Sequence, residues 1–425
     1  MNTTGIEEAW RARPADWLQP AREKGMADFL DTGFPDRRSE AWKYTDTQPL
    51  ADRSQAYLAA SQAAIDPAQL PSDSGDSLPI LFLNGRLVPG QRLPAAPGLQ
   101  LSSMNESTPE RQAQILARLA SFPGRPLEDL SALNAAFISD GLWIELAPDT
   151  VLEKPIEILF SSDGTKAAAQ PRIIVSAGAH SQCKLIEHYS GTGAGLVNAV
   201  TDIHCDHDAH LEWLKLQVES TFSLHVALQN LSLGRNSSAR LVQIELGSQL
   251  SRNDLQVNLA APGAHADVYG LFLADGHAHI DSRLEVQHQA PNTTSVENYR
   301  GIAAGRGRGI FNGKIIVQPG ADGTDAKLSN RNLLLSSTAE IDTKPELEIY
   351  ADDVKCAHGA TTGQLDETAL FYLRSRGVDA TQARGMLVGA FAADIVAQIP
   401  LERLRQQVEK ELSARLARDM GADTP

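Results

Sequence analysis

Two side chains that bind soft metals, Cys356 and His358, lie one residue apart in the stretch VKCAHGATTG. In an extended strand the side chains at positions i and i+2 lie on the same face, so this thiol and this imidazole can reach one bound atom. The pair suits a metal site, or a thiolate nucleophile stabilised by an imidazolium. Two structural strand residues are the competing interpretation, because short motifs often match by chance. A cysteine hydrolase would also need an orienting Asn or Asp and an oxyanion hole, and the sequence identifies neither.

Other stretches resemble functional sites less closely. HCDHDAH, residues 204–210, begins with residues that would face opposite sides of a strand, and its aspartates indicate a turn, so we interpret it as a solvated turn. HAHID, residues 277–281, has two histidines on one face but no second ligand cluster. The glycine-rich GRGRGIFNG, residues 305–313, is followed by a strand rather than a helix, and no G-x-x-x-x-G-K-[ST] occurs. We therefore expect no ATP hydrolysis by the chain itself.

The composition limits the classes of function. The 425 residues carry 38 Lys and Arg against 53 Asp and Glu, a net charge of −15, and no dense basic stripe, which argues against a nucleic-acid partner. The chain begins MNTTGIEEAW, without an apolar signal core, and no run approaches 18 apolar residues, so we expect a cytoplasmic protein outside the membrane. Its three cysteines include no C-x-x-C pair, so neither a disulfide framework nor an iron–sulfur cluster held by this chain alone is expected.

The elements that must position Cys356 and His358 fall into three predicted regions. Residues 1–140 are mainly helical, residues 141–360 consist of short alternating strands, and residues 361–425 are helical again. Within the middle region a weak repeat relates Cys183, Leu211, Leu241 and Val268, which follow one another at nearly equal steps. A period within the range of roughly 20–50 residues predicts stacked coils of a parallel β-helix, with a sandwich of coincidental spacing as the alternative.

Two apolar stripes follow residues 354–363 in the sequence. Met386, Leu387, Ala390, Phe391 and Ile395 form the first, and Leu401, Leu404, Val408, Leu412 and Leu416 form the second, on an otherwise charged helix. Packing on the core is the ordinary interpretation. A docking surface for a partner is the other.

The stretch from Ser329 to Phe391 is far more specific than any of these fragments. With its segments TKPELEI, DDVKCAHGAT and FYLRSRG, it resembles the SufB/SufD family of iron–sulfur cluster assembly scaffold proteins, and it is closer to the SufD branch. SEAWKYTD and LFLNGRLVP near the N-terminus also resemble that family, so the similarity spans nearly the whole chain. SufB paralogues have a sulfur-accepting cysteine in the last segment, where this sequence has Leu373. That departure implies that this chain does not carry the persulfide.

The resemblance implies a right-handed parallel β-helix core between helical terminal regions. It further implies a non-catalytic scaffold subunit that pairs with a SufB-like chain and SufC-like ATPases. The residues expected to bind partners are Phe371, Tyr372, Arg376, Met386, Leu387, Ala390 and Phe391. His358 is expected to be a ligand for iron or a nascent cluster at the shared interface, with Cys356 as a second candidate. No cofactor would then be stably bound by the chain alone, because the cluster or iron is transient and shared.

Three alternatives remain open at this stage. The first is a homodimeric β-helix interaction protein, which would use the same strand edge. The second is a Cys/His-dependent hydrolase that uses Cys356 and His358. The third is a β-helix enzyme acting on polysaccharide, although its usual row of exposed carboxylates is not evident.

Overall fold

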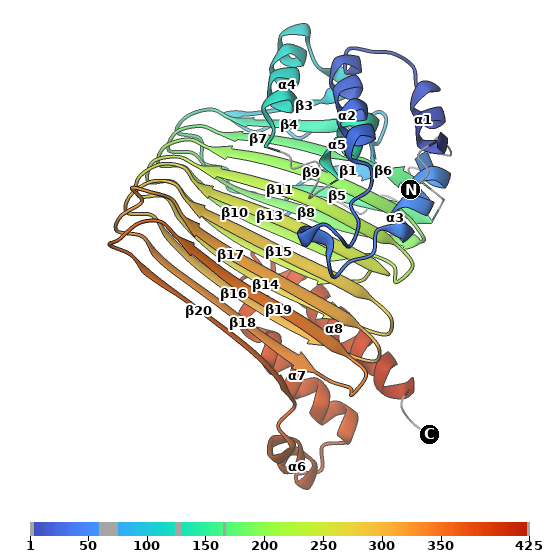
Figure 1. The fold of residues 1–425 in the computed structure, drawn as a ribbon, viewed down its shortest axis with the longest axis vertical. Helices are drawn as coiled ribbons and strands as arrows, with labels where there is room; N and C mark the ends of the chain where they lie inside the picture. Colours follow the sequence, from blue (N-terminus) through green and yellow to red (C-terminus); the bar gives the residue numbers. More distant parts are fainter. Residues whose placement is uncertain (1–3, 59–74, 124–129, 165–166, 423–425) are drawn as a thin grey trace.

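In the computed structural model, which describes residues 4–58, 75–123, 130–164 and 167–422, the middle of the chain winds into a parallel β-helix with helices at both ends (Figure 1). Successive strands alternate between two sheets, so each coil contributes one strand to each sheet and pairs in parallel with the coils before and after it. The predicted β-helix core between helical terminal regions is confirmed.

The first sheet has the order β2-β1-β5-β8-β10-β12-β14-β16-β18-β20. Its strands are β1 Leu78–Leu83, β2 Arg86–Leu87, β5 Ile156–Gly164, β8 Gln182–Gly193, β10 His210–Val218, β12 Ser238–Leu246, β14 His265–Ala274, β16 Thr294–Ala303, β18 Asp325–Leu334 and β20 Lys355–Gln364. The second sheet has the order β19-β17-β15-β13-β11-β9-β7-β4-β3, with β6 paired to β9. Its strands are β3 Leu99–Ser103, β4 Gly141–Leu146, β6 Ala168–Ala169, β7 Arg172–Ala177, β9 Leu196–Cys205, β11 Leu224–Leu233, β13 Leu250–Leu259, β15 His279–His288, β17 Arg308–Val317 and β19 Glu340–Ile349.

The strand register confirms the repeat and corrects one of its steps. Cys183 lies opposite Leu211, as predicted, but Leu211 lies opposite Ala239 rather than Leu241. The step from that coil to the next is therefore shorter than predicted, and it equals the step from Cys183 to Leu211. Despite this error, the predicted residue lies on the correct face of the strand. Side chains alternate between faces with a period of two, and Ala239 and Leu241 are two positions apart. Ala239, a small residue, gave a weaker hydrophobic signal than Leu241.

One row of turns stacks along the β-helix, and we call it the turn ridge. In each coil one turn residue has positive φ, and its backbone N–H donates to a carbonyl oxygen in the turn of the next coil. These turn-ridge residues are Asp149, His180, Asp208, Asn236, Gly263, Asn292 and Gly323. Asn, Asp and Gly tolerate this left-handed conformation best, which explains the composition of the ridge.

The N-terminal helices cover the first coils. They are α1 Thr4–Arg11, α2 Gln19–Thr32, the 3₁₀ turn η1 Glu40–Trp42, α3 Gln48–Leu58, the 3₁₀ turn η3 Met104–Glu106, α4 Pro109–Ser121 and α5 Ser131–Phe137. Buried Trp42 lies under the Arg252 guanidinium of β13, 3.7 Å from the ring centre. Strand β1 of this region already pairs with β5, so helical and β-helical parts are joined within one sheet. The predicted domain boundaries stay a prediction.

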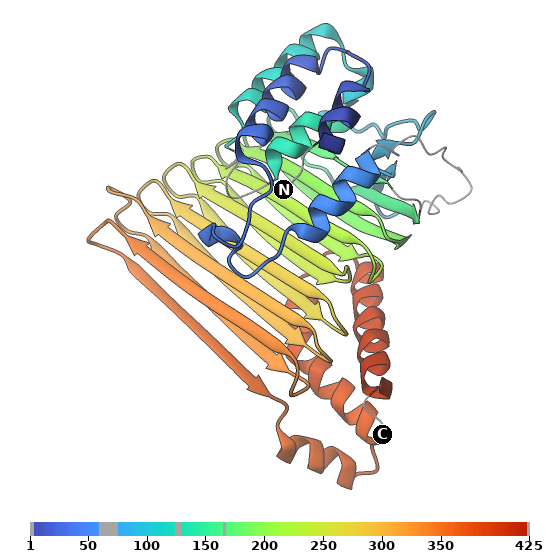
Figure 2. The same cartoon turned by 45° about the vertical axis from the view of Figure 1, so that its right-hand side comes forward.

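The C-terminal helices lie against the outer face of the first sheet and beyond its last strand. They are α6 Glu367–Ser375, α7 Ala380–Val396 and α8 Glu402–Ala422, and Figure 2 shows α6 projecting past β20. In α8 the predicted stripe is confirmed as a core surface, since Leu404, Val408, Leu412 and Leu416 are buried against the sheet. Arg403 fixes this helix through ion pairs with Asp76, at 3.0 Å, and with buried Glu157.

The stripe predicted in α7 packs on the core only in part, since Ile395 is buried and Phe391 packs against the core, whereas Met386 and Ala390 are exposed. The buried residues of that helix are Ala383, Val388, Ala392, Ile395 and Val396, whereas Met386 is half exposed. The sequence GMLVGAFAADIV is apolar on all sides, so periodicity alone did not identify the face that packs. Among the described residues, no helix combines the length and the apolar character needed to cross a membrane.

Candidate functional site

The strand that carries Cys356 and His358 is the last of its sheet. β20 pairs with β18, and no other described strand lies along its opposite edge. Cys356 lies opposite Ala326, and His358 lies opposite Leu328. Both of these β18 residues are buried in the interior. Cys356 and His358 therefore continue the inward-facing rows, side by side, at the open end of the β-helix.

The two side chains differ in burial. Cys356 is half buried and packs against the end of the hydrophobic core, whereas His358 is exposed. Burial raises the pKa of the Cys356 thiol, and the negative charges of Asp325 and Glu297 raise it further. A reactive thiolate needs an electropositive surrounding that lowers its pKa, and the surrounding of Cys356 does the opposite.

A carboxylate lies deeper in the same row. Glu297 of β16 lies opposite Leu328, which in turn lies opposite His358. Its side chain is fully buried, and both carboxylate oxygens lack a hydrogen-bond partner of normal geometry among the described residues. Burial raises the pKa of Glu297 to about 8, although the Ser295 hydroxyl lowers it slightly. The interior behind the Cys356–His358 strand thus holds a carboxyl group that is mostly protonated at neutral pH.

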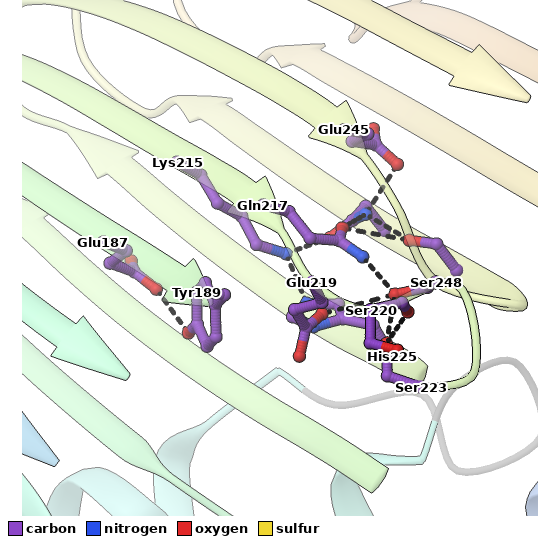
Figure 3. Close-up of polar contacts among 12 residues, drawn as sticks. Glu187, Tyr189, Lys215, Gln217, Glu219, Ser220, Ser223, His225, Glu245 and Ser248 are labelled. Atoms are coloured by element: carbon purple, nitrogen blue, oxygen red, sulfur yellow. Dashed lines mark hydrogen bonds and ion pairs between the residues drawn. The ribbon is translucent and has the colours of Figure 1, made fainter. Parts of the chain in front are cut away.

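Further into the β-helix, polar side chains replace apolar ones between the two sheets (Figure 3). We call this set the interior network, and it comprises Glu187, Tyr189, Lys215, Gln217, Glu219, His225, Glu245, Ser248 and Asn253. Lys215 donates to Nε2 of His225, at 2.9 Å, and to the amide oxygen of Asn253. Asn253 in turn donates to Oε2 of Glu245 at 2.7 Å. One buried cation is therefore surrounded by several buried carboxyl groups.

Burial disfavours the charged forms of the ionisable groups in this network and shifts their pKa values accordingly. It lowers the pKa of Lys215 to about 8 and raises the pKa of Glu245 to about 7. Burial and the Lys215 charge lower the pKa of His225 to about 4, so its imidazole is neutral at pH 7. A cavity of about 20 Å³, which can hold one water molecule, borders Tyr189 and Glu219. The network can exchange protons near neutral pH, but it lies several coils from Cys356 and His358.

The residues predicted to bind partners lie mainly on the surface. Phe371 is 73% exposed, and Tyr372 and Met386 are more than half exposed. The Arg376 guanidinium lies 5.2 Å from the centre of the Tyr372 ring, and Ala390 is exposed as well. Leu387 and Phe391 are partly buried, the latter beside the Arg300 guanidinium at 5.7 Å.

The sequence prediction missed Glu297 and the interior network. Both lie on predicted alternating strands whose polar residues were given no role, and these residues come together through the coil register rather than through spacing along the chain. Polar residues at alternate positions of β-like runs, as in HLEWLKLQV and LVQIELG, were the available signal.

Comparisons with known proteins cover most of this architecture. A family model described as "SUF system FeS cluster assembly, SufBD core domain" matches residues 160–391, and one described as "SufBD protein N-terminal region" matches residues 6–158. An iron–sulfur cluster assembly SufBD family protein of Synechocystis sp. is 31% identical, over 96% of this chain and 94% of its own length. The iron–sulfur cluster assembly protein SufD of Escherichia coli is 28% identical over 93% of both chains. The chloroplastic protein ABCI7 of Arabidopsis thaliana is 25% identical over 97% of this chain and 89% of its own.

Proposed function

Because this chain belongs to the SufBD family of SUF-system iron–sulfur cluster assembly proteins, we propose that it is a cytoplasmic, non-catalytic scaffold subunit that builds nascent clusters together with a SufB-like paralogue. Its similarity to SufD over 93% of both chains supports the SufD role in such a pair. Leu373, in the position of the sulfur-accepting cysteine of SufB paralogues, leaves persulfide binding to the partner.

The observation that carries this proposal is the free edge of β20. A parallel strand without a neighbour presents unpaired backbone N–H and C=O groups, which a strand of another chain can satisfy. Cys356 and His358 lie on this edge strand, so a paired chain would bring its own side chains next to them. A site at this edge would be shared by two subunits.

The ligand count agrees with a shared site. A cluster of the common types has four protein ligands, usually thiolates, with histidine as a known replacement. This chain offers one half-buried thiol and one exposed imidazole at the edge, and its other two cysteines are buried in the core. The paralogue would supply the remaining ligands. His358, as the exposed member, is the proposed ligand for iron or the transient cluster, and Cys356 is a second ligand beside it.

The C-terminal helices are the proposed docking surface for a SufC-like ATPase. Phe371, Tyr372 and Met386 expose large apolar side chains that contribute little to this chain's own core. α8 packs on the β-helix and is ion-paired to it, so movement of a docked ATPase would be transmitted to the coils. ATP-driven approach of two such ATPases would then reshape the edge that carries His358.

The environment of Cys356 supports this scaffold over the hydrolase. A cysteine nucleophile requires a lowered thiol pKa, whereas burial and nearby carboxylates raise that of Cys356. A homodimer through the same edge is a second candidate, because another copy of β20 could also satisfy the free backbone groups.

Two glycines allow each interface to be tested without disturbing the fold. A Cβ at Gly359 of β20 or at Gly389 of α7 meets no other atom within 4 Å. Gly359→Lys would place a long charged side chain on the outer face of the edge strand, next to the backbone groups with which a partner strand would pair. Gly389→Lys would place one on the exposed face of α7. The chain, its paralogue and the ATPase would be co-purified anaerobically from the native cytosol.

We expect Gly359→Lys to lose the paralogue and retain the ATPase, and Gly389→Lys to show the reverse. If Gly359→Lys keeps the paralogue and Gly389→Lys keeps the ATPase, the proposed surfaces are contradicted. Recovery of the chain only as a homodimer, from wild type as well, would favour the homodimeric interaction protein.

A further inference from the structure

A second group of metal-ligating side chains lies on the turn ridge, far from β20. His180 follows β7, and His207 and Asp208 follow β9 in the next coil. One potential ligand atom from each of these three residues lies within 4.8 Å of the other two. Within the described ranges, this is the one set of three such residues that comes so close together.

The geometry is close to that of a metal-binding set. Nδ1 of His207 lies 3.1 Å from Oδ2 of Asp208, and Nδ1 of His180 lies 4.0 Å from the same oxygen. Ligands about 2.1 Å from a tetrahedral ion are roughly 3.4 Å apart, so modest side-chain rotations would bring all three to one ion. The side chains are 53%, 40% and 34% exposed for His180, His207 and Asp208, which leaves an ion open to solvent on one side.

The turn ridge fixes these residues relative to one another. The backbone N–H of His180 donates to the carbonyl oxygen of His207, at 3.1 Å, which holds the two coils in register. Asn236, from the third coil, donates its amide N–H to Oδ1 of Asp208 at 3.2 Å. Oδ1 is thereby occupied, and Oδ2 is the oxygen that faces both imidazoles. A carboxylate held through one oxygen is oriented for ligation through the other.

We propose that His180, His207 and Asp208 form a binding site for a divalent first-row transition-metal ion, with two imidazole nitrogens and one carboxylate oxygen as its protein ligands. This donor set suits Fe²⁺, Co²⁺, Ni²⁺ or Zn²⁺, and it leaves coordination positions for water or an incoming donor. If the proposed scaffold function holds, Fe²⁺ is the relevant ion, held loosely enough to be passed on.

The site is distinct from the Cys356–His358 strand. The turn ridge continues from Asp208 through Asn236, Gly263, Asn292 and Gly323, and Gly323 donates to the carbonyl oxygen of Asp353, two residues before β20. Coils repeat about every 4.8 Å, so five coils separate the two sites by roughly 24 Å. One ion cannot contact both, and the ridge metal site would bind its ion without the paralogue.

The test is an anaerobic titration of the untagged chain with Co²⁺, followed by the visible absorption of bound Co²⁺ and by equilibrium dialysis. Wild type should bind one ion in a complex with nitrogen and oxygen ligands. His207→Ala and His180→Ala should each weaken binding by at least about tenfold. A double variant, Cys356→Ser with His358→Ala, should bind at the ridge as tightly as wild type, which separates this site from the proposed function.

A matched control lies beside the same ridge. Nε2 of His265 lies 3.3 Å from Oδ1 of Asp267, and the exposure of this histidine is similar to that of His207. Among the described residues, however, no third ligand joins this pair. His265→Ala should therefore leave Co²⁺ binding unchanged. Equal Co²⁺ affinity of wild type and His207→Ala would overturn the proposal, as would loss of binding in the Cys356/His358 double variant or in His265→Ala. Far-UV circular dichroism of each variant establishes that the β-helix is intact.

Discussion

Glu297 allows a direct measurement of how a buried carboxyl group behind β20 changes the free energy of unfolding. Substitution by Gln keeps the size of the side chain and removes its ionisable group. Burial raises the pKa of the Glu297 carboxyl from 4.5 to about 8. The folded protein therefore retains a proton that the unfolded chain loses, and the free energy of unfolding falls as the pH rises between those two values.

The magnitude follows from the same two values. Each pH unit between them is worth about 1.4 kcal/mol, so the full penalty is about 5 kcal/mol once the pH is well above 8. Glu297→Gln carries no such penalty. The stability of the variant relative to wild type should therefore increase by about 4 kcal/mol between pH 5 and pH 9, with most of the increase below pH 8. Other groups titrate in both proteins and cancel in the difference.

The assay is urea unfolding followed by far-UV circular dichroism, at unit steps from pH 5 to pH 9, for wild type and Glu297→Gln. Glu212→Gln is the matched control, because that carboxylate lies on β10, is 38% exposed and pairs with Lys184 at the surface. Its difference from wild type should change little over this range. A stability difference for Glu297→Gln that does not vary with pH would refute the conclusion that this carboxyl is protonated in the folded state.

Three further predictions concern the core and the attachment of α8. Lys215→Met should lower the free energy of unfolding at pH 7 by about 3–5 kcal/mol, because it leaves buried carboxyl groups without their cation. Urea unfolding would measure this loss, and a loss below about 1 kcal/mol would contradict the prediction. Gly270→Ala should lower the free energy of unfolding by about 1–3 kcal/mol in the same assay, since its Cβ would clash with the buried Tyr299 ring. Wild-type stability of this variant would show that the ring moves freely. Arg403→Met should leave Glu157 without its ion-pair partner and speed proteolytic cleavage within α8, whereas an unchanged cleavage rate would mean that apolar packing alone holds the helix.

The parts of the fold that the sequence predicted depend on local spacing. Alternation with a period of two placed Cys356 and His358 on one face, and the register with β18 agrees with it. The nearly constant spacing of similar segments identified the coils, although small Ala239 was passed over for Leu241. Both patterns are carried by residues close in sequence or by a regular repeat.

What the sequence left unpredicted depends on contacts between coils. His180 and His207 belong to successive coils. HCDHDAH was interpreted as a solvated turn, which is correct for residues 206–209 but omits His180 of the preceding coil, whose ring meets that of His207 edge to face. Glu297 was missed for a related reason, because its environment is set by β18 and β20 and not by its own strand. For α7 the obstacle was different, since its apolar residues surround the helix and do not distinguish the face that packs.

The central claim is that His358 is a ligand for iron or a nascent cluster at an interface between this chain and its paralogue. The most direct test is to purify the complex anaerobically from cells that express wild type or His358→Ala, and to assay iron and acid-labile sulfide per complex. We predict that His358→Ala retains the paralogue and the ATPase in normal proportion but loses most of the iron and sulfide. An intact His358→Ala complex with the iron and sulfide content of wild type would contradict the claim.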